Sequence, residues 1–486
     1  MNKHIIYVLL VSLVFFSCED NFDEYNTNPQ NAQVGSDEVV PRYQLGPITD
    51  ALKATGQISN QVAPEYTRQF SYNTSSYRVS ELVASQYNGM WNKVYRLNPT
   101  INNVLMQTEE AEDAVDKVVR AITQISKVYL FTGLSDIYGD IPYSEAGDIA
   151  IQFPKYDTQE FIYNDGFALL DEAIIALTAQ ISANVSLPTD DRVYGGDVTK
   201  WIRFANSLKL RLAMRLSDVD GTTAAAKIQE AMNHSGGLIS SNDESATIEN
   251  FDGEGPEHSI YQMRNEPFRM AKFLVDYLND TNDPRLPIWA DPAVNGGDYV
   301  GVDNSLIDFP DNDNFSKLSE ANIFQRTLED IVLMFSETEF LKAEAYLKGI
   351  GVGKDDNAAN TAYRAGIQAS LEYWGVEADA VTAFLAQDFA TLSGDDVAKL
   401  EQIAEQKWVS LFLTGTELWS EVRRLDYPVY PSRNGVPGYF QGDTNGEMPT
   451  RLDYPEDEAS LNAENYDAAN AKYPQVIASK VWWDVN

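Results

Sequence analysis

The side chains of this protein that could do acid–base chemistry are mainly carboxylates, because 73 Asp and Glu residues accompany only three His and one Cys. Hydrolysis of a glycosidic bond needs two carboxylates about 5–10 Å apart. Glu337, Glu339 and Glu344 share one predicted helix whose other face is apolar, so packing and ion pairing explain these acids better than catalysis. The sequence contains no Ser-His-Asp signature and no Gly-rich phosphate loop. We therefore predict no catalytic residue, with a glycan hydrolase as the alternative.

Metal and cofactor chemistry finds little support in the sequence. A zinc site of the Cys/His type would need more of these ligands than the chain has. The run from Asp311 to Asn314 resembles the start of an EF-hand loop, but the Gly and the terminal Glu are missing at the required spacing. We expect no cofactor and no metal.

Aromatic rings in predicted loops are the candidates for binding a sugar, whose C–H face desolvates well against a flat ring. The chain has 26 Tyr and 8 Trp residues, and a place in the core is the competing interpretation for each ring. One cluster follows Phe70, a second lies in the loop that begins near position 289, and one Trp opens a predicted helix. The predicted ligand-binding residues are Trp91, Tyr77, Trp289, Tyr299, Tyr72 and Asn98.

The formal net charge of −37 limits the partners of the protein. Such a surface repels phosphate, which argues against nucleic acid as a ligand. It argues against anionic polysaccharides as well, unless the protein has a local basic patch. The charge also keeps the protein soluble and hinders self-association.

The N-terminus has the pattern of an export signal. Lys3 supplies a positive start, and the apolar run from Ile5 to Phe16 is too short to span a hydrocarbon core of about 30 Å. Ser17 before Cys18 resembles a bacterial lipobox, in which the Cys is acylated and becomes the first mature residue. We expect residues 1–17 to be a signal peptide and Cys18 to carry a lipid anchor, followed by a short acidic tether.

Helical periodicity predicts the elements that must position these side chains. We expect helices at 113–134, 199–216, 329–348, 397–413 and 416–425. Lys200, Arg203, Arg211 and Arg215 lie beside the apolar stripe of the second helix, and we expect them to pair with internal carboxylates.

Glycines and long loops complete the organisation of the chain. Gly133 is the predicted end of the first helix, and Gly415 is the predicted break between the last two helices. Long irregular stretches occupy 252–258, 291–316 and 431–456, and such loops are often functional. No Pro/Ser-rich linker divides the chain, so we predict a single domain over 18–486.

Several segments together resemble the SusD/RagB family, and within it the SusD-like branch. They are Leu130–Tyr143 with its Gly-Asp-Ile-Pro turn, Tyr194–Ala213, Asp283–Leu286, Glu337–Ala345, Glu405–Trp408, Glu417–Arg424 and Arg451–Asn465. The acidic residues directly behind Cys18 also resemble the surface-export signal of Bacteroidetes lipoproteins. The segments follow the order of the family, and the resemblance covers essentially the whole mature chain.

This resemblance implies a mainly α, SusD-like fold built on TPR-like helix pairs, with a loop-rich ligand face. It implies an outward-facing outer-membrane lipoprotein that binds a glycan or oligosaccharide and delivers it to a SusC-like TonB-dependent transporter for nutrient uptake. Members of the family are not enzymes, and some bind peptides. A TPR-type scaffold that binds peptides therefore remains an alternative beside a surface-anchored glycoside hydrolase.

Removal of the anchoring thiol tests the lipoprotein prediction. We expect Cys18→Ala to release the protein from membranes or to leave its leader uncleaved, because it removes the only Cys of the chain. Membrane fractionation together with labelling by a radioactive fatty acid measures this. A Cys18→Ala protein that stays in the membrane fraction and carries acyl label would contradict the prediction.

Overall fold

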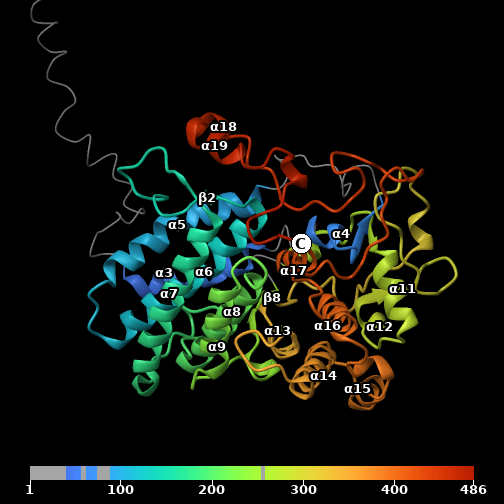
Figure 1. The fold of residues 1–486 in the computed structure, drawn as a ribbon, viewed down its shortest axis with the longest axis horizontal. Coiled ribbons are helices and arrows are strands. Elements are labelled where there is room, and N and C mark those ends of the chain that lie inside the picture. The colour runs from blue at the N-terminus through green and yellow to red at the C-terminus, as the bar shows by residue number, and fades with distance from the viewer. Residues whose placement is uncertain (1–39, 56–61, 74–87, 253–257) are drawn as a thin grey trace, which may run out of the picture.

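The described part of the chain is mainly helical. The computed structural model describes residues 40–55, 62–73, 88–252 and 258–486. The predicted residues Cys18 and Tyr77 lie outside these ranges. Helices fill both halves of the molecule, and short strands and long loops connect them (Figure 1). The mainly α fold expected from the sequence is confirmed.

Successive helices of the first half pack together in pairs, α6 against α7 and α8 against α9. The helices and 3-10 turns of this half are α3 (Pro41–Asp50), η1 (Ala51–Thr55), α4 (Ala63–Tyr66), α5 (Gly89–Gln107), α6 (Ala114–Tyr138), α7 (Gln159–Ala179), η4 (Ile181–Ala183), α8 (Val198–Arg215), α9 (Gly221–Asn233) and η5 (Asn242–Glu244).

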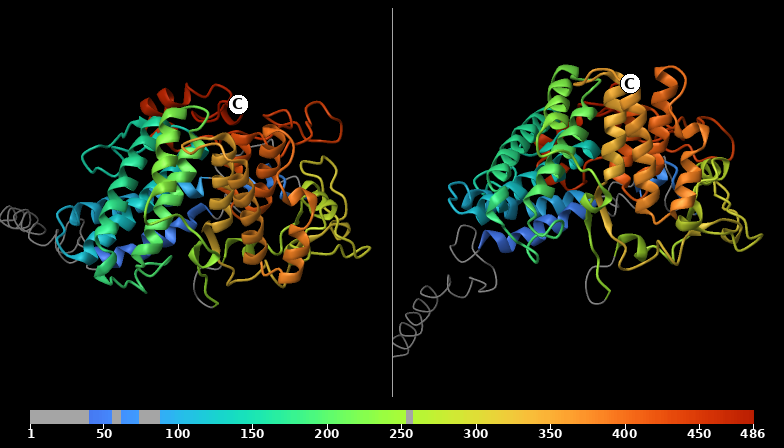
Figure 2. Two further views of the ribbon diagram at one scale, coloured as in Figure 1. Left: turned by 60° about the horizontal axis from the view of Figure 1, so that its bottom comes forward. Right: turned by 90° about the horizontal axis from the view of Figure 1, so that it is seen from below.

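The second half repeats this arrangement, with α13 packed against α14 and α16. Figure 2 shows these orange helices side by side, next to the green helices of the first half. The elements are α10 (Ser259–Gln262), α11 (Lys272–Asp280), α12 (Leu286–Trp289), η6 (Asn312–Asn314), α13 (Phe335–Lys348), α14 (Asp356–Tyr373), α15 (Ala378–Leu385), η7 (Asp388–Ala390), α16 (Asp396–Ser410), α17 (Gly415–Leu425), α18 (Glu458–Leu461), α19 (Ala463–Asn470) and η8 (Val476–Ala478).

The strands of the described residues form small antiparallel pairs that fasten loops to the helices. The pairs are β1 (Phe70–Tyr72) with β5 (Phe268–Met270), β2 (Ile141–Pro142) with β3 (Tyr156–Asp157), β4 (Ala246–Ile248) with β8 (Asp330–Leu333), and β6 (Ala290–Asp291) with β7 (Lys317–Leu318).

The predicted helices are present, with corrections at their ends. The helix expected at 113–134 continues to Tyr138, because Gly133 packs inside it near Met90, whereas Gly139 has a φ of +82° and ends it. Positions 330–333 of the helix expected at 329–348 form strand β8 instead, because they pair with β4.

The turn between α16 and α17 also differs from the expectation. Gly415 is the first residue of α17, and the chain reverses at Leu413, whose φ is +66°. Leu413 is buried in the apolar cluster around β1 and α12, and this packing holds the backbone in a conformation that side chains rarely adopt.

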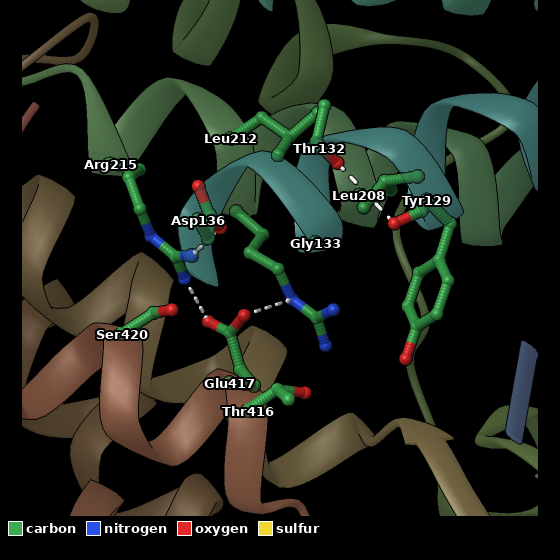
Figure 3. Close-up of a pocket in the computed structure, with 11 residues that line it drawn as sticks. Tyr129, Thr132, Gly133, Asp136, Leu208, Leu212, Arg215, Thr416, Glu417 and Ser420 are labelled. Carbon is green, nitrogen blue, oxygen red and sulfur yellow. Dashed lines mark hydrogen bonds and ion pairs between the residues drawn. The ribbon is translucent and has the colours of Figure 1, made fainter. Parts of the chain in front are cut away.

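A network of buried ion pairs joins the two halves of the molecule. Arg211 on α8 donates two hydrogen bonds to Glu337 on α13, at 2.6 and 2.7 Å. Arg215, one turn further on α8, pairs with Asp136 on α6 and with Glu417 on α17 (Figure 3). The predicted pairing of these α8 arginines with internal carboxylates is confirmed.

The network continues into the second half through Arg424 on α17. Arg424 Nη2 lies 2.6 Å from Glu344 Oε2 and 2.7 Å from Glu421 Oε2, and Lys407 Nζ lies 2.7 Å from the same Glu421 oxygen. Burial raises the pKa of Glu421, but Arg424 and Lys407 hold it well below its ordinary value. The Glu421 carboxylate therefore stays charged in the core because it has several cationic partners.

The C-terminal segment packs against the first half of the molecule and is hydrogen-bonded to it. Trp483 Nε1 donates to Asp136 Oδ1 at 2.8 Å, across 347 residues of sequence. Tyr454 donates its hydroxyl to the carbonyl of Asp140 at 2.6 Å. The Tyr473 hydroxyl fills the position that a Cβ on Gly139 would take, so this part of the Gly-Asp-Ile-Pro turn requires a glycine.

Removal of one buried charge tests the role of the network. We expect Glu344→Gln to lower the free energy of unfolding by about 3–5 kcal/mol, because it leaves Arg424 with one carboxylate fewer in the core. Denaturant unfolding measures this change. Asp396→Asn is the matched control, since Asp396 pairs with Lys354 at the exposed surface and its loss should leave stability unchanged. Equal stability of Glu344→Gln and wild type would contradict the prediction.

The effect of Glu344 should also depend on pH. Burial opposes ionisation, but Arg424 and Lys348 lower the pKa of Glu344 from 4.5 to about 2. The unfolded chain binds this proton more readily, so the stabilisation by Glu344 is fully present above about pH 4.5 and is lost as the pH falls through 2. The difference in unfolding free energy between wild type and Glu344→Gln should narrow over this window.

Candidate functional site

Helix α5 presents a polar face to solvent above an aromatic layer. Asn92, Lys93 and Arg96 are exposed, whereas Trp91 retains 4% of its accessible surface. The spacing of these residues explains the division, because positions three and four apart share one face of a helix. Tyr95 is half-buried between the two faces, with its ring centroid 4.8 Å from that of Trp91.

The loop between β2 and β3 is one wall of the site. The Tyr95 hydroxyl donates to the carbonyl of Pro142 at 2.6 Å, and Asn98 Nδ2 donates to the carbonyl of Ala146 at 2.7 Å. Gly147 has a φ of +82°, and a Cβ there would lie 2.9 Å from Asn98 Nδ2. A glycine therefore lets the loop lie directly on α5.

The opposite wall comes from the segment of α18 and α19, which Figure 1 shows at the top of the molecule, above β2. Asn462 Nδ2 donates to the carbonyl of Pro154 at 2.7 Å, and Tyr156 donates its hydroxyl to Glu458 Oε2 at 2.7 Å. Burial raises the pKa of the Glu458 carboxyl, and the bond from Tyr156 offsets this in part.

Two pockets of about 400 and 410 Å³ lie on this face of α5, and both include Asn92 and Arg96. We call the pair the α5 groove. Its first pocket is lined by Trp91, Asn92, Tyr95, Arg96, Pro142, Ala146, Gly147, Gln152, Pro154, Glu458, Leu461 and Asn462. Its second pocket is lined by Pro47, Asp50, Ala51, Gly89, Asn92, Lys93, Arg96 and Leu97.

The α5 groove combines ring surface with polar groups that have no partner among the described residues. The side chains of Asn92, Gln152 and Arg96 make no hydrogen bond or ion pair with the described residues. Apolar ring surface with a few free polar groups is the usual make-up of a small-ligand site, and a sugar needs both. The Asp50 and Glu458 carboxylates line different pockets of the groove.

Two of the residues predicted from the sequence lie at the α5 groove. Trp91 forms part of its floor, but it also packs against Tyr95, Tyr138 and Tyr454 and is largely core. Asn98 is buried beneath the loop wall, where it holds the carbonyl of Ala146, and its Oδ1 has no partner within the structure described. Both residues support the groove more than they line it.

The other predicted rings lie elsewhere. Trp289 was expected on a loop, and this is corrected: it ends α12, is fully buried, and stacks on Phe412 with ring centroids 4.1 Å apart. Tyr72 is buried in β1 against Phe268. Tyr299 is half-buried in its loop and packs against the same apolar cluster as Trp289, and Tyr77 lies outside the described residues.

Sequence reasoning missed Arg96 and Glu458 as groove residues. The exposed positions of α5 give a signal, since Asn92 and Arg96 are four apart on a polar face. Nothing in the sequence pairs this face with Glu458, which follows more than three hundred residues later.

The described residues hold neither a cluster of metal ligands nor a helix suited to a membrane. No His, Cys, Asp and Glu side chains in these ranges gather in a group of three or more that could hold a metal ion. Among the helices described, none combines the length and the apolar character that crossing a membrane requires.

Comparisons with known proteins agree on one family. No curated protein matches the sequence. A chitin-binding protein of known structure is 27% identical, with a TM-score of 0.79 over 92% of this chain and 100% of its own. A SusD-like protein from Bacteroides thetaiotaomicron is 26% identical, with a TM-score of 0.78 over 92% of this chain and 99% of its own.

A SusD homologue from Bacteroides uniformis is 27% identical, with a TM-score of 0.75 over 91% of this chain and 100% of its own. The family model SusD-like_2, described as "Starch-binding associating with outer membrane", matches residues 43–455. The chain is therefore a member of the SusD/RagB family, as its sequence motifs indicated.

Proposed function

We propose that the protein is a lipid-anchored outer-membrane receptor that binds a glycan in the α5 groove and passes it to a SusC-like TonB-dependent transporter. The α5 groove carries this proposal, because it joins the rings of Trp91 and Tyr95 to amide and guanidinium groups that have no partner in the described ranges. The starch-binding description of the family and the chitin-binding neighbour support a glycan as ligand.

The delivery role and the location rest on the family and on the N-terminus. Cys18 closes an export signal and is the proposed anchor of a single domain over 18–486. A receptor held by its lipid at the outward surface could present its groove to a transporter beside it. Co-purification of the full-length protein with a TonB-dependent barrel from its own membrane tests this part of the proposal.

Binding without catalysis fits the carboxylates of the α5 groove better than hydrolysis. A glycosidase holds its acid and its second carboxylate across one scissile bond. Asp50 and Glu458 line different pockets, and Glu458 is held by Tyr156. Among the described residues, therefore, neither pocket of the groove is lined by two carboxylates, which supports binding over hydrolysis.

Ring removal tests the location of the site. We expect Tyr95→Ala to weaken binding of chitin or starch oligosaccharides about five- to hundredfold, since stacking on one ring is worth about 1–3 kcal/mol. Calorimetric titration with the two oligosaccharide series measures this. Tyr95→Phe is the control, because it keeps the ring and loses only the bond to the Pro142 carbonyl.

A core ring gives the second control for the site. Trp289→Ala should lower the free energy of unfolding by about 3–5 kcal/mol, with the affinity of the folded protein unchanged, because this ring is enclosed. Full affinity of Tyr95→Ala, or loss of affinity in folded Trp289→Ala, would place the site away from the α5 groove. Binding of peptides in preference to both sugar series would favour the scaffold alternative.

Product analysis tests the absence of catalysis. We expect no shorter sugar after prolonged incubation of any bound oligosaccharide with pure protein, and the same result for Glu458→Gln. Chromatography of the sugars measures this. Product that appears with wild type and disappears with Glu458→Gln would establish the hydrolase alternative.

A further inference from the structure

The charged side chains that line the α5 groove are Asp50, Lys93, Arg96 and Glu458. They stand in a protein of net charge −37, where acids outnumber bases two to one. A charged side chain is available to a ligand only if it is not already paired with another group of the protein.

The two carboxylates of the groove are already engaged. Asp50 Oδ1 lies 2.7 Å from Lys53 Nζ and 3.8 Å from Arg192 Nε. Glu458 Oε2 accepts the hydroxyl of Tyr156 at 2.7 Å, and burial favours its neutral form by raising the pKa of the carboxyl. Neither carboxylate faces Arg96 as an ion-pair partner.

The two cations of the groove have no such partner. Neither Lys93 nor Arg96 makes a hydrogen bond or an ion pair with the described residues, and both side chains are exposed. The other described arginines of the chain mostly bind carboxylates or carbonyls, as Arg211 and Arg424 do in the core. Arg96 therefore presents a guanidinium without a partner among the described residues, and it lines both pockets.

We infer that the α5 groove selects an acidic glycan, with Arg96 and Lys93 binding a carboxylate or sulfate group of the sugar. The inference rests on the proposed function and adds the class of ligand. A guanidinium presents a planar fork of N–H donors that matches two oxygens of one anionic group, whereas a hydroxyl uses only one of them. The acidic surroundings repel such a sugar elsewhere on the surface, so the groove is a local exception.

The ring of Tyr95 and the cations have complementary roles in this arrangement. The ring lies one residue before Arg96 on α5 and lines the same pocket. A sugar that stacks on Tyr95 can therefore direct a charged substituent toward Arg96. The ring supplies affinity for any pyranose, and the guanidinium supplies the preference for an acidic one.

Matched pairs of sugars test this inference. The probes are uronic-acid oligosaccharides with their methyl esters, and sulfated oligosaccharides with their desulfated forms. We expect at least one acidic member to bind tenfold or more tightly than its neutral form, and this binding to weaken between 50 and about 500 mM salt. The pair of sugars that shows this difference in affinity tells whether the groove prefers a carboxylate or a sulfate.

Variants assign the preference to named residues. Arg96→Gln should lower the affinity for the acidic sugar about tenfold or more and leave the affinity for its neutral form unchanged, with Lys93→Gln giving a smaller effect of the same sign. Lys272→Gln is the control, because it removes the same charge from an exposed side chain on α11, at the other end of the molecule (Figure 1). Unchanged melting temperatures show that the variants fold.

The possible outcomes separate the inference from the proposed function. If the neutral forms bind as tightly as the acidic ones, or if Arg96→Gln weakens both forms equally, the acidic preference is wrong and glycan binding stands. If no sugar in either series, including the chitin and starch oligosaccharides, binds to the wild-type protein, the proposed function fails, and the inference fails with it.

Discussion

The buried ion network is the interaction on which the arrangement of this protein depends. A charge in the core costs several kcal/mol unless it meets an opposite charge with good geometry. Arg211 and Arg215 on α8 find theirs on α6, α13 and α17, which are far apart in the sequence. These helices must therefore meet in one register before α8 can be buried. The network makes the two halves into a single structure, and the α5 groove is held on that structure.

The fold could be predicted from the sequence to a large extent, because its long helices repeat apolar residues with a helical period. The motifs with Glu344, Glu417 and Arg424 identified the family, and the structure shows that they form the core network. The local sequence pattern predicted the wrong secondary structure where contacts with distant segments determine the backbone conformation. Strand β8 is a strand because β4 pairs with it, and Leu413 turns the chain because the core holds it there.

The candidate site was much less predictable, since it is assembled from segments that the sequence keeps apart. A Trp in a loop-rich region suggests an exposed ring, but Trp289 is enclosed because α12 places it against Phe412. The polar face of α5 can be read from the spacing of Asn92 and Arg96. Its far wall cannot, because tertiary hydrogen bonds such as those from Tyr156 to Glu458 and from Asn462 to the Pro154 carbonyl bring that wall to the groove. The periodicity of a sequence indicates which side chains are buried. A binding site also depends on which exposed surfaces of distant segments lie next to each other.

The bond between Trp483 and Asp136 has a consequence for the order in which the protein folds. Asp136 binds Arg215 and Tyr163 within the first half, yet it also accepts from an indole that is synthesised 347 residues later. Contacts of such long range form late, because a large loop has to close before they give any stability. Until Trp483 is in place, the buried carboxylate of Asp136 lacks one of its hydrogen-bond donors. The core around Asp136 can therefore close only after the segment that carries Trp483 has been synthesised.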